Sequence, residues 1–342
     1  MTPLAKRLVG RMAELTALRS AEVALANAKD NQRHVRWTAD DLAADAARLA
    51  PGDSAVVIGA GPSLHRQHPA QMLREHGYDG TIIAADGALS YCLRNGLVPH
   101  FLVTLDPDPS RMCRWFGDTE LESRPDDDYF RRQDLDPYLG TDERARNREL
   151  IELVNRHGSS MRAIICTSVA PNVTRRCLES GMTLYWWNPL LDDVERPESL
   201  ARRLYQMNRI PCMVSGGNVG AAAWVAAHQL LGKRQIALVG MDFGYAPGTP
   251  IERTQYFSTL AELFGDRAHD ALIRVKNPHL KDAWLTDPAY YWYRDAFLDM
   301  AAQAPAVTYN CTEGGILFGR GVQWVPLKAF LAARSPAAEA VG

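Results

Sequence analysis

The sequence has no long apolar run and no excess of charge of either sign. No stretch approaches the ~20 apolar residues that a membrane-spanning helix needs, so we expect no membrane span. Its 38 Lys and Arg residues nearly balance its 40 Asp and Glu residues, which leaves a net charge of −2. The chain therefore lacks the basic excess that drives nonspecific binding to nucleic acid, and we expect no nucleic-acid partner.

Cysteine is scarce as well, with six residues in 342. None of the six belongs to a C-x-x-C pair, so the sequence predicts neither a disulfide framework nor a structural zinc site. The N-terminus has no continuous apolar stretch with a small-residue cleavage site, which argues against a secretory signal. These absences together favour the reducing cytoplasm as the location of the protein.

The composition that is present is typical of a globular protein, with 46% hydrophobic and 23% charged residues. The pattern along the chain divides it into four segments. We expect an N-terminal helical segment over 1–50 and a nucleotide-binding α/β core over 51–250. A C-terminal helical lid with a return strand is expected over 251–335, and a polar tail over 336–342.

Apolar residues in 3–29 recur at helical spacing, beginning with Leu4, Leu8 and Met12. This stripe predicts a helix that packs on the main body or on a second copy of the chain, which would make the protein a homo-oligomer. Membrane-surface binding is the alternative for such an amphipathic helix.

From residue 54 onward, short apolar runs alternate with helical segments. The predicted strands cover 54–58, 81–85, 101–104, 163–166, 183–186, 211–214, 236–239 and 307–309. The predicted helices include 67–76, 88–95, 170–180, 200–207, 219–231, 288–303 and 326–334. This alternation predicts an α/β fold with a doubly wound, mostly parallel sheet and helices on both faces. The charged segment 117–148 is predicted to be a solvated loop.

The unusual residues lie repeatedly at the ends of the predicted strands. They are Gly59–Ser63, Asp86-Gly87, Asp106–Asp108, Ser215–Asn218, Asp242 and Asn310–Gly315. Ligands of open parallel sheets bind in the crevice at the carboxyl ends of the strands. We therefore expect these segments to converge on one pocket that binds a phosphorylated small molecule.

The first strand end reads Gly59-x-Gly61-Pro62-Ser63. Glycine permits close backbone approach, and the amides at the start of the next helix can hold an anion. The segment is neither the G-x-G-x-x-G dinucleotide signature nor a P-loop. We predict that Gly59, Gly61, Pro62 and Ser63 bind phosphate; a tight turn capped by Ser63 is the alternative. His65 follows the loop closely enough to reach a phosphate.

Two acidic strand ends are further candidates. Asp86 and Gly87 follow a strand at the place where a ribose hydroxyl is often held, and a simple turn is the alternative. Asp106 and Asp108 put two carboxylates on one side of an extended segment, which suits Mg²⁺ or Mn²⁺ on a diphosphate. The alternative is a turn stiffened by proline.

The segment Ser215-Gly216-Gly217-Asn218 precedes a predicted helix and is a second candidate site for an anion. Its alternative is a helix N-cap formed by Asn218 without a ligand.

Three sets of motifs occur in an order and spacing that resemble a known superfamily. They are GAGPSL (59–64), AADGA (84–88) with LVPHFLVTLDP (97–107), and GGNVG (216–220) with IALVGMDFG (236–244). Together they resemble the 6-hydroxymethylpterin pyrophosphokinase-like superfamily, which includes the bacterial motility accessory factor glycosyltransferases. The element YNCTEGGILFG (309–319) is similar to a C-terminal element of these glycosyltransferases, whereas the third-strand motif departs from the Asp-Leu-Asp-Gly type of the pyrophosphokinases.

The resemblance implies a glycosyltransferase that uses a nucleotide-activated sugar, with CMP-nonulosonate as donor and an acceptor that the sequence does not indicate. It implies catalytic roles for Asp106, Asp108 and Glu313. The implied nucleotide- or phosphate-binding residues are Gly59, Gly61, Pro62, Ser63, Asp86, Gly87, Ser215, Gly216, Gly217, Asn218 and Asp242. Asn310, Thr312 and Gly314 would line the sugar or acceptor.

Two alternatives stay open. A Mg²⁺-dependent pyrophosphokinase would move diphosphate from ATP to a pterin-like alcohol, with the metal on Asp106 and Asp108. A nucleotide-binding module without catalysis would use the same glycine loops.

Overall fold

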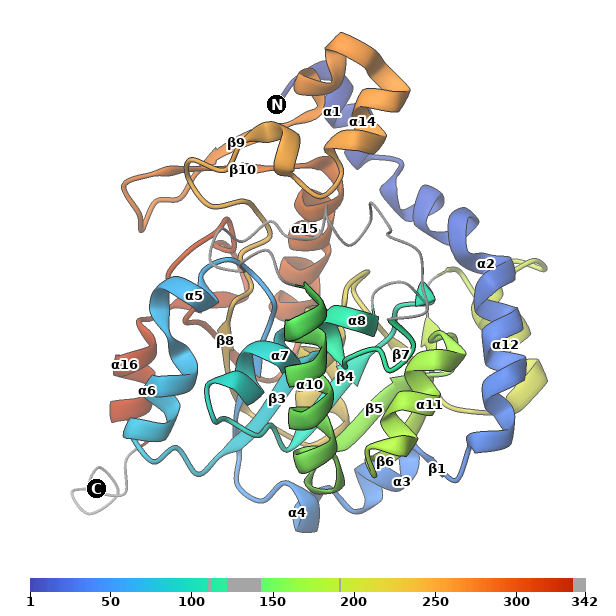
Figure 1. Ribbon diagram of the computed structural model, residues 1–342. Coiled ribbons are helices and arrows are strands. Elements are labelled where there is room, and N and C mark those ends of the chain that lie inside the picture. Colours follow the sequence, from blue (N-terminus) through green and yellow to red (C-terminus); the bar gives the residue numbers. More distant parts are fainter. Residues whose placement is uncertain (110–111, 122–142, 191, 335–342) are drawn as a thin grey trace.

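The computed structural model describes residues 1–109, 112–121, 143–190 and 192–334. Its centre is a ten-stranded sheet in the order β1-β6-β5-β4-β3-β2-β8-β11-β12, with β7 paired to β6 (Figure 1). Neighbouring strands of this sheet are parallel. The structure confirms the predicted doubly wound α/β fold.

The strands agree closely with the apolar runs of the sequence. Their bounds are β1 (Trp37–Thr38), β2 (Ser54–Ile58), β3 (Thr81–Ala85), β4 (Phe101–Thr104), β5 (Arg162–Cys166), β6 (Thr183–Leu190), β7 (Cys212–Val214), β8 (Gln235–Val239), β11 (Val307–Asn310) and β12 (Val322–Trp324). Strands β1 and β12 were not predicted. Both are short edge strands without a clear apolar pattern.

The strand order reverses between β2 and β8, which pair in register from Ser54 with Gln235 to Ile58 with Val239. Strands β3 to β6 follow on one side of β2, and β11 and β12 lie on the other side of β8. The strand order thus reverses at this point of the carboxyl edge, and ligand crevices of parallel sheets form at such switch points.

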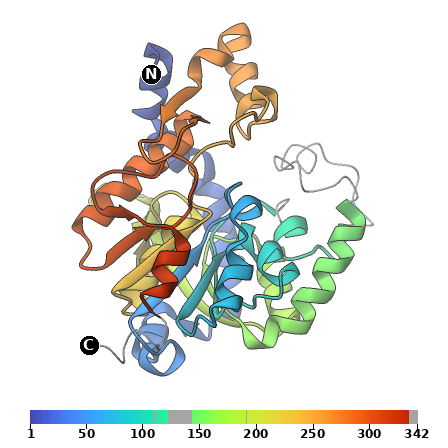
Figure 2. The same cartoon turned by 90° about the vertical axis from the view of Figure 1, so that its left-hand side faces the viewer.

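Helices cover both faces of the sheet (Figure 2). One face packs against α6 (Pro69–Glu75), α7 (Asp86–Arg94), α10 (Glu143–His157), α11 (Pro171–Glu179) and α16 (Leu327–Ala332). The other packs against α3 (Ala39–Ala44), α13 (Val219–Val225) and α15 (Pro288–Gln303). Alternate residues of each strand enter the two cores, as in β2, where Val56 faces one and Val57 the other.

The N-terminal helical stripe forms α1 (Pro3–Val9) and α2 (Met12–Asn31), separated by Gly10. Helix α2 packs on α12 (Leu200–Asn208) through Ala24, Ala28, Leu200 and Leu204. Helix α2 thus packs on the main body of the molecule, which was one of the two predicted arrangements. Assembly with a second copy stays a prediction.

A small unit stands above the carboxyl edge of the sheet (Figure 1). It contains α14 (Phe257–Phe264) and the antiparallel strands β9 (Ile273–Lys276) and β10 (Ala283–Thr286), and it packs against α1. The chain then returns to the sheet through α15 and β11.

Three local expectations need correction. The helix expected over 67–76 is split into α5 (Leu64–Gln67) and α6, because His68 has φ of 48° before Pro69. Helix α7 begins at Asp86, so the interpretation of Asp86-Gly87 as a simple turn is wrong. The charged segment is helical from residue 143, where Leu150 and Val154 of α10 enter the core.

The triple aspartate at 126–128 and the tail over 336–342 lie outside the described residues. Among the helices that the structure describes, none combines the length and the apolar character required to cross a bilayer.

Candidate functional site

A cavity of about 1490 Å³ opens at the carboxyl edge of the sheet, beside the switch point. Five of the six strand-end segments singled out in the sequence contribute to it. They are Gly59–Pro62, Asp86-Gly87, Asp106–Asp108, Ser215 with Gly217 and Asn218, and Asp242. The parallel sheet brings them together because all of its strands end at the same edge.

The loop after β2 is pressed against the loop after β8. The amide of Gly59 donates to the carbonyl of Val239, and the amide of Gly61 donates to the carbonyl of Gly240, both at 2.8 Å. A Cβ on Gly59 would lie 2.6 Å from the Gly240 carbonyl oxygen, and a Cβ on Gly61 would overlap the carboxylate of Asp242. Only glycine fits these two positions, as close backbone approach requires.

Ser63 and Asp242 form a buried pair behind this loop. The Ser63 hydroxyl donates to Asp242 Oδ2 at 2.7 Å, and the Ser63 amide donates to the same oxygen at 3.3 Å. Ser63 is 2% exposed and does not line the cavity. Its hydroxyl therefore orients Asp242 and does not cap α5; the predicted phosphate contact is not supported by this placement.

Asp242 is 1% exposed, and this burial raises its pKa to about 6. Its second oxygen, Oδ1, has no hydrogen-bond partner among the described residues. A carboxylate repels a phosphate when it is charged, so this geometry favours Asp242 as a support of the glycine loop over a direct phosphate ligand.

Asp86 is the first residue of α7 and its Oδ1 accepts a hydrogen bond from the Gly87 amide at 2.7 Å. A Cβ on Gly87 would lie 2.8 Å from the Cβ of Ala60 and 3.4 Å from Trp115 Nε1. The absence of a side chain at Gly87 thus lets the β2 loop, α7 and α8 (Met112–Trp115) meet at the cavity.

Asp106 and Asp108 both line the cavity and are partly exposed. Asp106 Oδ1 accepts a hydrogen bond from the Asp108 amide at 2.9 Å, which is the turn expected as the alternative. Carboxylates of this kind suit Mg²⁺, which takes one or two carboxylates together with substrate phosphates. Within the described parts of the chain, no three His, Cys, Asp or Glu side chains gather as a metal site. The metal stays a prediction.

Asn218 caps α13, because its Oδ1 accepts a hydrogen bond from the Ala221 amide at 2.9 Å. Gly216 and Gly217 precede it with φ of 60° and 82°, a conformation that favours glycine. Ser215, Gly217 and Asn218 line the cavity, whereas Gly216 does not.

The sixth segment stays behind the cavity. The structure does not bring Asn310, Thr312, Glu313 or Gly314 into its lining. Their polar groups close the turn that supports the β8 loop. Asn310 Nδ2 donates to the Leu317 carbonyl at 2.5 Å, and Thr312 Oγ1 accepts from the Met241 amide at 3.1 Å.

Glu313 and Gly314 complete this support. Glu313 Oε1 accepts from the Leu327 amide at the start of α16, at 3.1 Å. A Cβ on Gly314 would lie 2.7 Å from Asp242 Oδ1. Direct sugar binding or catalysis by these four residues stays a prediction, and the geometry gives them a positioning role.

The cavity also contains basic and aromatic residues that the sequence reasoning missed. Arg94, Arg114, Arg146, Trp115 and Tyr290 all line it. The spacing of Asp86, Ser90 and Arg94 every four residues on one helix was a usable signal for Arg94. Arg146 gave none, because its segment was predicted to be a loop.

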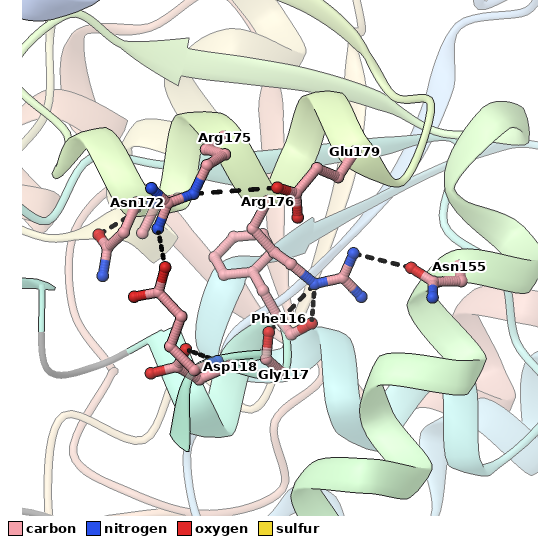
Figure 3. A network of polar contacts seen from close by, with 10 residues as sticks. Phe116, Gly117, Asp118, Asn155, Asn172, Arg175, Arg176 and Glu179 are labelled. Atoms are coloured by element: carbon pink, nitrogen blue, oxygen red, sulfur yellow. Dashed lines mark hydrogen bonds and ion pairs between the residues drawn. The ribbon is translucent and has the colours of Figure 1, made fainter. Parts of the chain in front are cut away.

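A buried arginine fixes α8 at the cavity (Figure 3). Arg176 of α11 donates from Nε to the carbonyls of Phe116 and Gly117, at 3.2 and 3.1 Å, and from Nη1 to Asn155 Oδ1 at 2.8 Å. Its partners are neutral, and burial lowers its pKa. Through these bonds Arg176 holds the turn that follows Trp115.

Comparison with known proteins agrees with the resemblance found in the motifs. The family described as 6-hydroxymethylpterin diphosphokinase MptE-like matches residues 24–121. This match confirms the predicted resemblance over a part of the chain that contains Gly59–Ser63, Asp86 and Asp106–Asp108.

Two individual proteins are also similar. An uncharacterized protein of Treponema pallidum (strain Nichols) is 40% identical over 53 residues, which are 16% of this chain and 24% of that protein. The structure of a MAf glycosyltransferase from Magnetospirillum magneticum AMB-1 superposes with a TM-score of 0.48 and 17% identity, and covers 89% of this chain and 42% of that one. The chain thus spans less than half the length of either protein.

Proposed function

We propose that the chain is a transferase that binds a nucleotide-activated sugar in this cavity and passes the sugar to an acceptor, with a CMP-nonulosonate as donor. One observation carries the proposal. The glycine loop after β2, Asp86, and the Asp106–Asp108 pair, which lie far apart in the sequence, line a single cavity at the switch point of a parallel sheet. Such crevices are where α/β proteins bind nucleotides.

The site suits the departure of a nucleotide. The glycine loop can approach a phosphate with its backbone, and Asp86, which is in the lining of the cavity, would accept a ribose hydroxyl. Asp106 and Asp108 would hold Mg²⁺, which, when bound, neutralises charge on the phosphates. The departing nucleotide gains negative charge, so donors aimed at it stabilise the transition state more than the bound donor.

The C-terminal element favours sugar transfer over diphosphate transfer. Its sequence resembles that of bacterial glycosyltransferases, and Thr312 and Gly314 contact the β8 loop directly. The element therefore supports the wall of the cavity, although its residues are not part of the lining.

A second candidate is a Mg²⁺-dependent diphosphokinase that uses ATP. The match of residues 24–121 to the MptE-like diphosphokinase family favours it, because this range holds Asp86, Asp106 and Asp108 of the cavity. In this reaction the same carboxylates would hold the metal, and catalysis would consist of positioning and charge neutralisation.

Thermal unfolding with CMP, ATP and GDP, each with and without Mg²⁺, separates the candidates. A nucleotide at 100 times its Kd stabilises the fold by ~2.7 kcal/mol. Stabilisation by CMP, with a glycosylated product detected by mass spectrometry when a CMP-sugar and an acceptor panel are added, supports sugar transfer. Stabilisation by ATP only with Mg²⁺, with a diphosphorylated pterin alcohol, supports the second candidate. Binding without any product leaves a nucleotide-binding module, and no binding rejects both proposals.

A further inference from the structure

One arm of the cavity runs along α7. Asp86, Ser90 and Arg94 follow each other at intervals of four residues and all line the cavity, so they lie on one side of the helix. Eight residues at 1.5 Å per residue carry this arm about 12 Å from Asp86 to Arg94. Arg146 and Glu149 of α10 form the opposite side, and we call this arm the arginine groove.

Arg94 of α7 is bonded to α10 in the arginine groove. Arg94 donates from Nε to Glu149 Oε2 and from Nη2 to the backbone carbonyl of Arg146, both at 3.0 Å. These bonds place the Arg94 guanidinium beside the backbone of Arg146. Helices α7 and α10 are neighbours in the fold (Figure 1), and each contributes one arginine to the lining of the cavity.

The donors of the groove exceed its acceptors. The partly buried Arg146 guanidinium makes no hydrogen bond or ion pair within the parts of the chain that the structure describes, and neither does Nη1 of Arg94. The Glu149 carboxylate, whose side chain is 54% exposed, offsets one of the two charges at this end of the groove. The Asp86 carboxylate lies at the other end, about 12 Å along α7. Arg114 brings a further positive charge to the cavity.

We propose that the arginine groove binds a second anionic group of the substrate, a carboxylate or a phosphoryl group, separate from the phosphate at the glycine loop. Guanidinium forks match both groups, and their bidentate hydrogen bonds are strong where water is partly excluded. The inference rests on the proposed function for the identity of the ligand, and it narrows the substrate to one with two anionic groups. A sugar acid joined to a nucleotide, or a phosphorylated acceptor, has this character.

Arg146→Gln is the sharpest test, because its side chain makes no bond that the fold uses. Arg94→Gln is the second test variant. Because Arg94 also bonds α7 to α10, thermal unfolding checks that this variant keeps its fold. Arg156→Gln is the matched control: it removes the same charge from the same helix, about 15 Å further along it, at an exposed residue that does not line the cavity.

The measurement is calorimetric titration with inorganic diphosphate and, separately, with free N-acetylneuraminate, without any nucleotide. We expect at least one probe to bind. Each cavity substitution should lower the affinity for that probe by about tenfold, which is the effect of losing one charged hydrogen bond. If only the affinity for diphosphate falls, the groove binds a phosphoryl group. If the affinity for the sugar acid falls, the groove binds a carboxylate. Arg156→Gln should leave both affinities unchanged.

The proposal is overturned if neither probe binds, or if Arg146→Gln binds both probes as tightly as the unmodified chain. The result is independent of the proposed function. If CMP and ATP fail to bind while an anion still binds in an Arg146-dependent manner, the proposed function fails and the groove stands. If a nucleotide binds and neither anion depends on Arg146, the groove alone is rejected.

Discussion

Single glycines decide how closely the loops after β2 and β8 approach each other. Gly61 and Gly314 lie on either side of the Asp242 carboxylate, one against each oxygen. Neither has a positive φ, so their need for glycine is one of space and not of backbone conformation. A methyl group at either position must displace a buried carboxylate or a backbone carbonyl.

We expect Gly61→Ala to lower the free energy of unfolding by about 1–3 kcal/mol, the usual cost of overpacking. It should also abolish the nucleotide-dependent rise in melting temperature, because it moves the loop. Gly10→Ala is the control: its φ is −65° and its new Cβ would lie 3.5 Å from the nearest atom. Chemical denaturation and thermal unfolding with ligand measure the two effects. Unchanged ligand binding in Gly61→Ala would remove the loop from the site.

At the scale of secondary-structure elements, two long-range ties position the cavity. Asn27 and Asn31 of α2 donate to the loops after β4 and β5. Asn27 reaches the carbonyls of Pro107 and Ser168 at 3.2 and 3.0 Å. Asn31 reaches those of Thr167 and Val169 at 2.9 and 2.8 Å. The N-terminal helix thus holds the loop that carries Asp106 and Asp108.

Asn27→Ala should loosen this loop with a small loss of stability, since Asn27 is partly exposed. We expect faster hydrogen exchange at the amides around Asp108 and weaker nucleotide binding, while global unfolding changes by about 1 kcal/mol. Lys29→Ala, an exposed position on the same helix, is the control. If exchange near Asp108 is the same in both variants, α2 has no part in positioning the loop.

The second tie is Arg176, which offers a matched comparison with its neighbour Arg175. Arg176→Met leaves several buried carbonyls without a donor, and we expect a loss of on the order of 3 kcal/mol or more. Arg175 pairs with Glu120 at 2.9 Å on the surface, where its side chain is 53% exposed. Arg175→Met should therefore cost about 0–1 kcal/mol. Urea unfolding compares the two, and equal losses would mean that the buried network contributes nothing beyond a surface pair.

At the scale of the whole molecule, two buried carboxyl groups make stability depend on pH. Burial raises the pKa of Asp242 and of Asp287 from 3.8 to about 6. Between these values the folded state keeps a proton that the unfolded chain releases, so stability falls as pH rises from 3.8 to about 6. Each carboxyl contributes on the order of 2–3 kcal/mol to this fall.

The difference between the unmodified chain and Asp242→Asn isolates one of these groups. We expect the unmodified chain to lose stability relative to the variant between about pH 4 and pH 6, and the difference to be constant above that range. His100 and His228, whose pKa values are lowered by desolvation, titrate in both proteins and cancel. Denaturant unfolding from pH 4 to pH 8 measures the difference. A difference that does not change with pH would contradict a raised pKa at Asp242.

The sequence by itself determined the sheet and the approximate position of the site. Strands β2, β3 and β4 have the predicted bounds, because a strand buried on both faces is a continuous apolar run with a sharp polar end. The polar residues at these ends are local signals, and a parallel sheet gathers them at one edge.

Only the tertiary structure decided which side chains face the cavity. The Ser63 hydroxyl donates to Asp242 Oδ2 across 179 positions of sequence, whereas local spacing suggested that it contacts a phosphate. Arg94 and Arg146 face one groove because α7 and α10 pack together, and the spacing within either helix does not contain that fact. Local periodicity determines which face of an element is apolar, whereas the partner of a polar group depends on which elements the fold brings side by side.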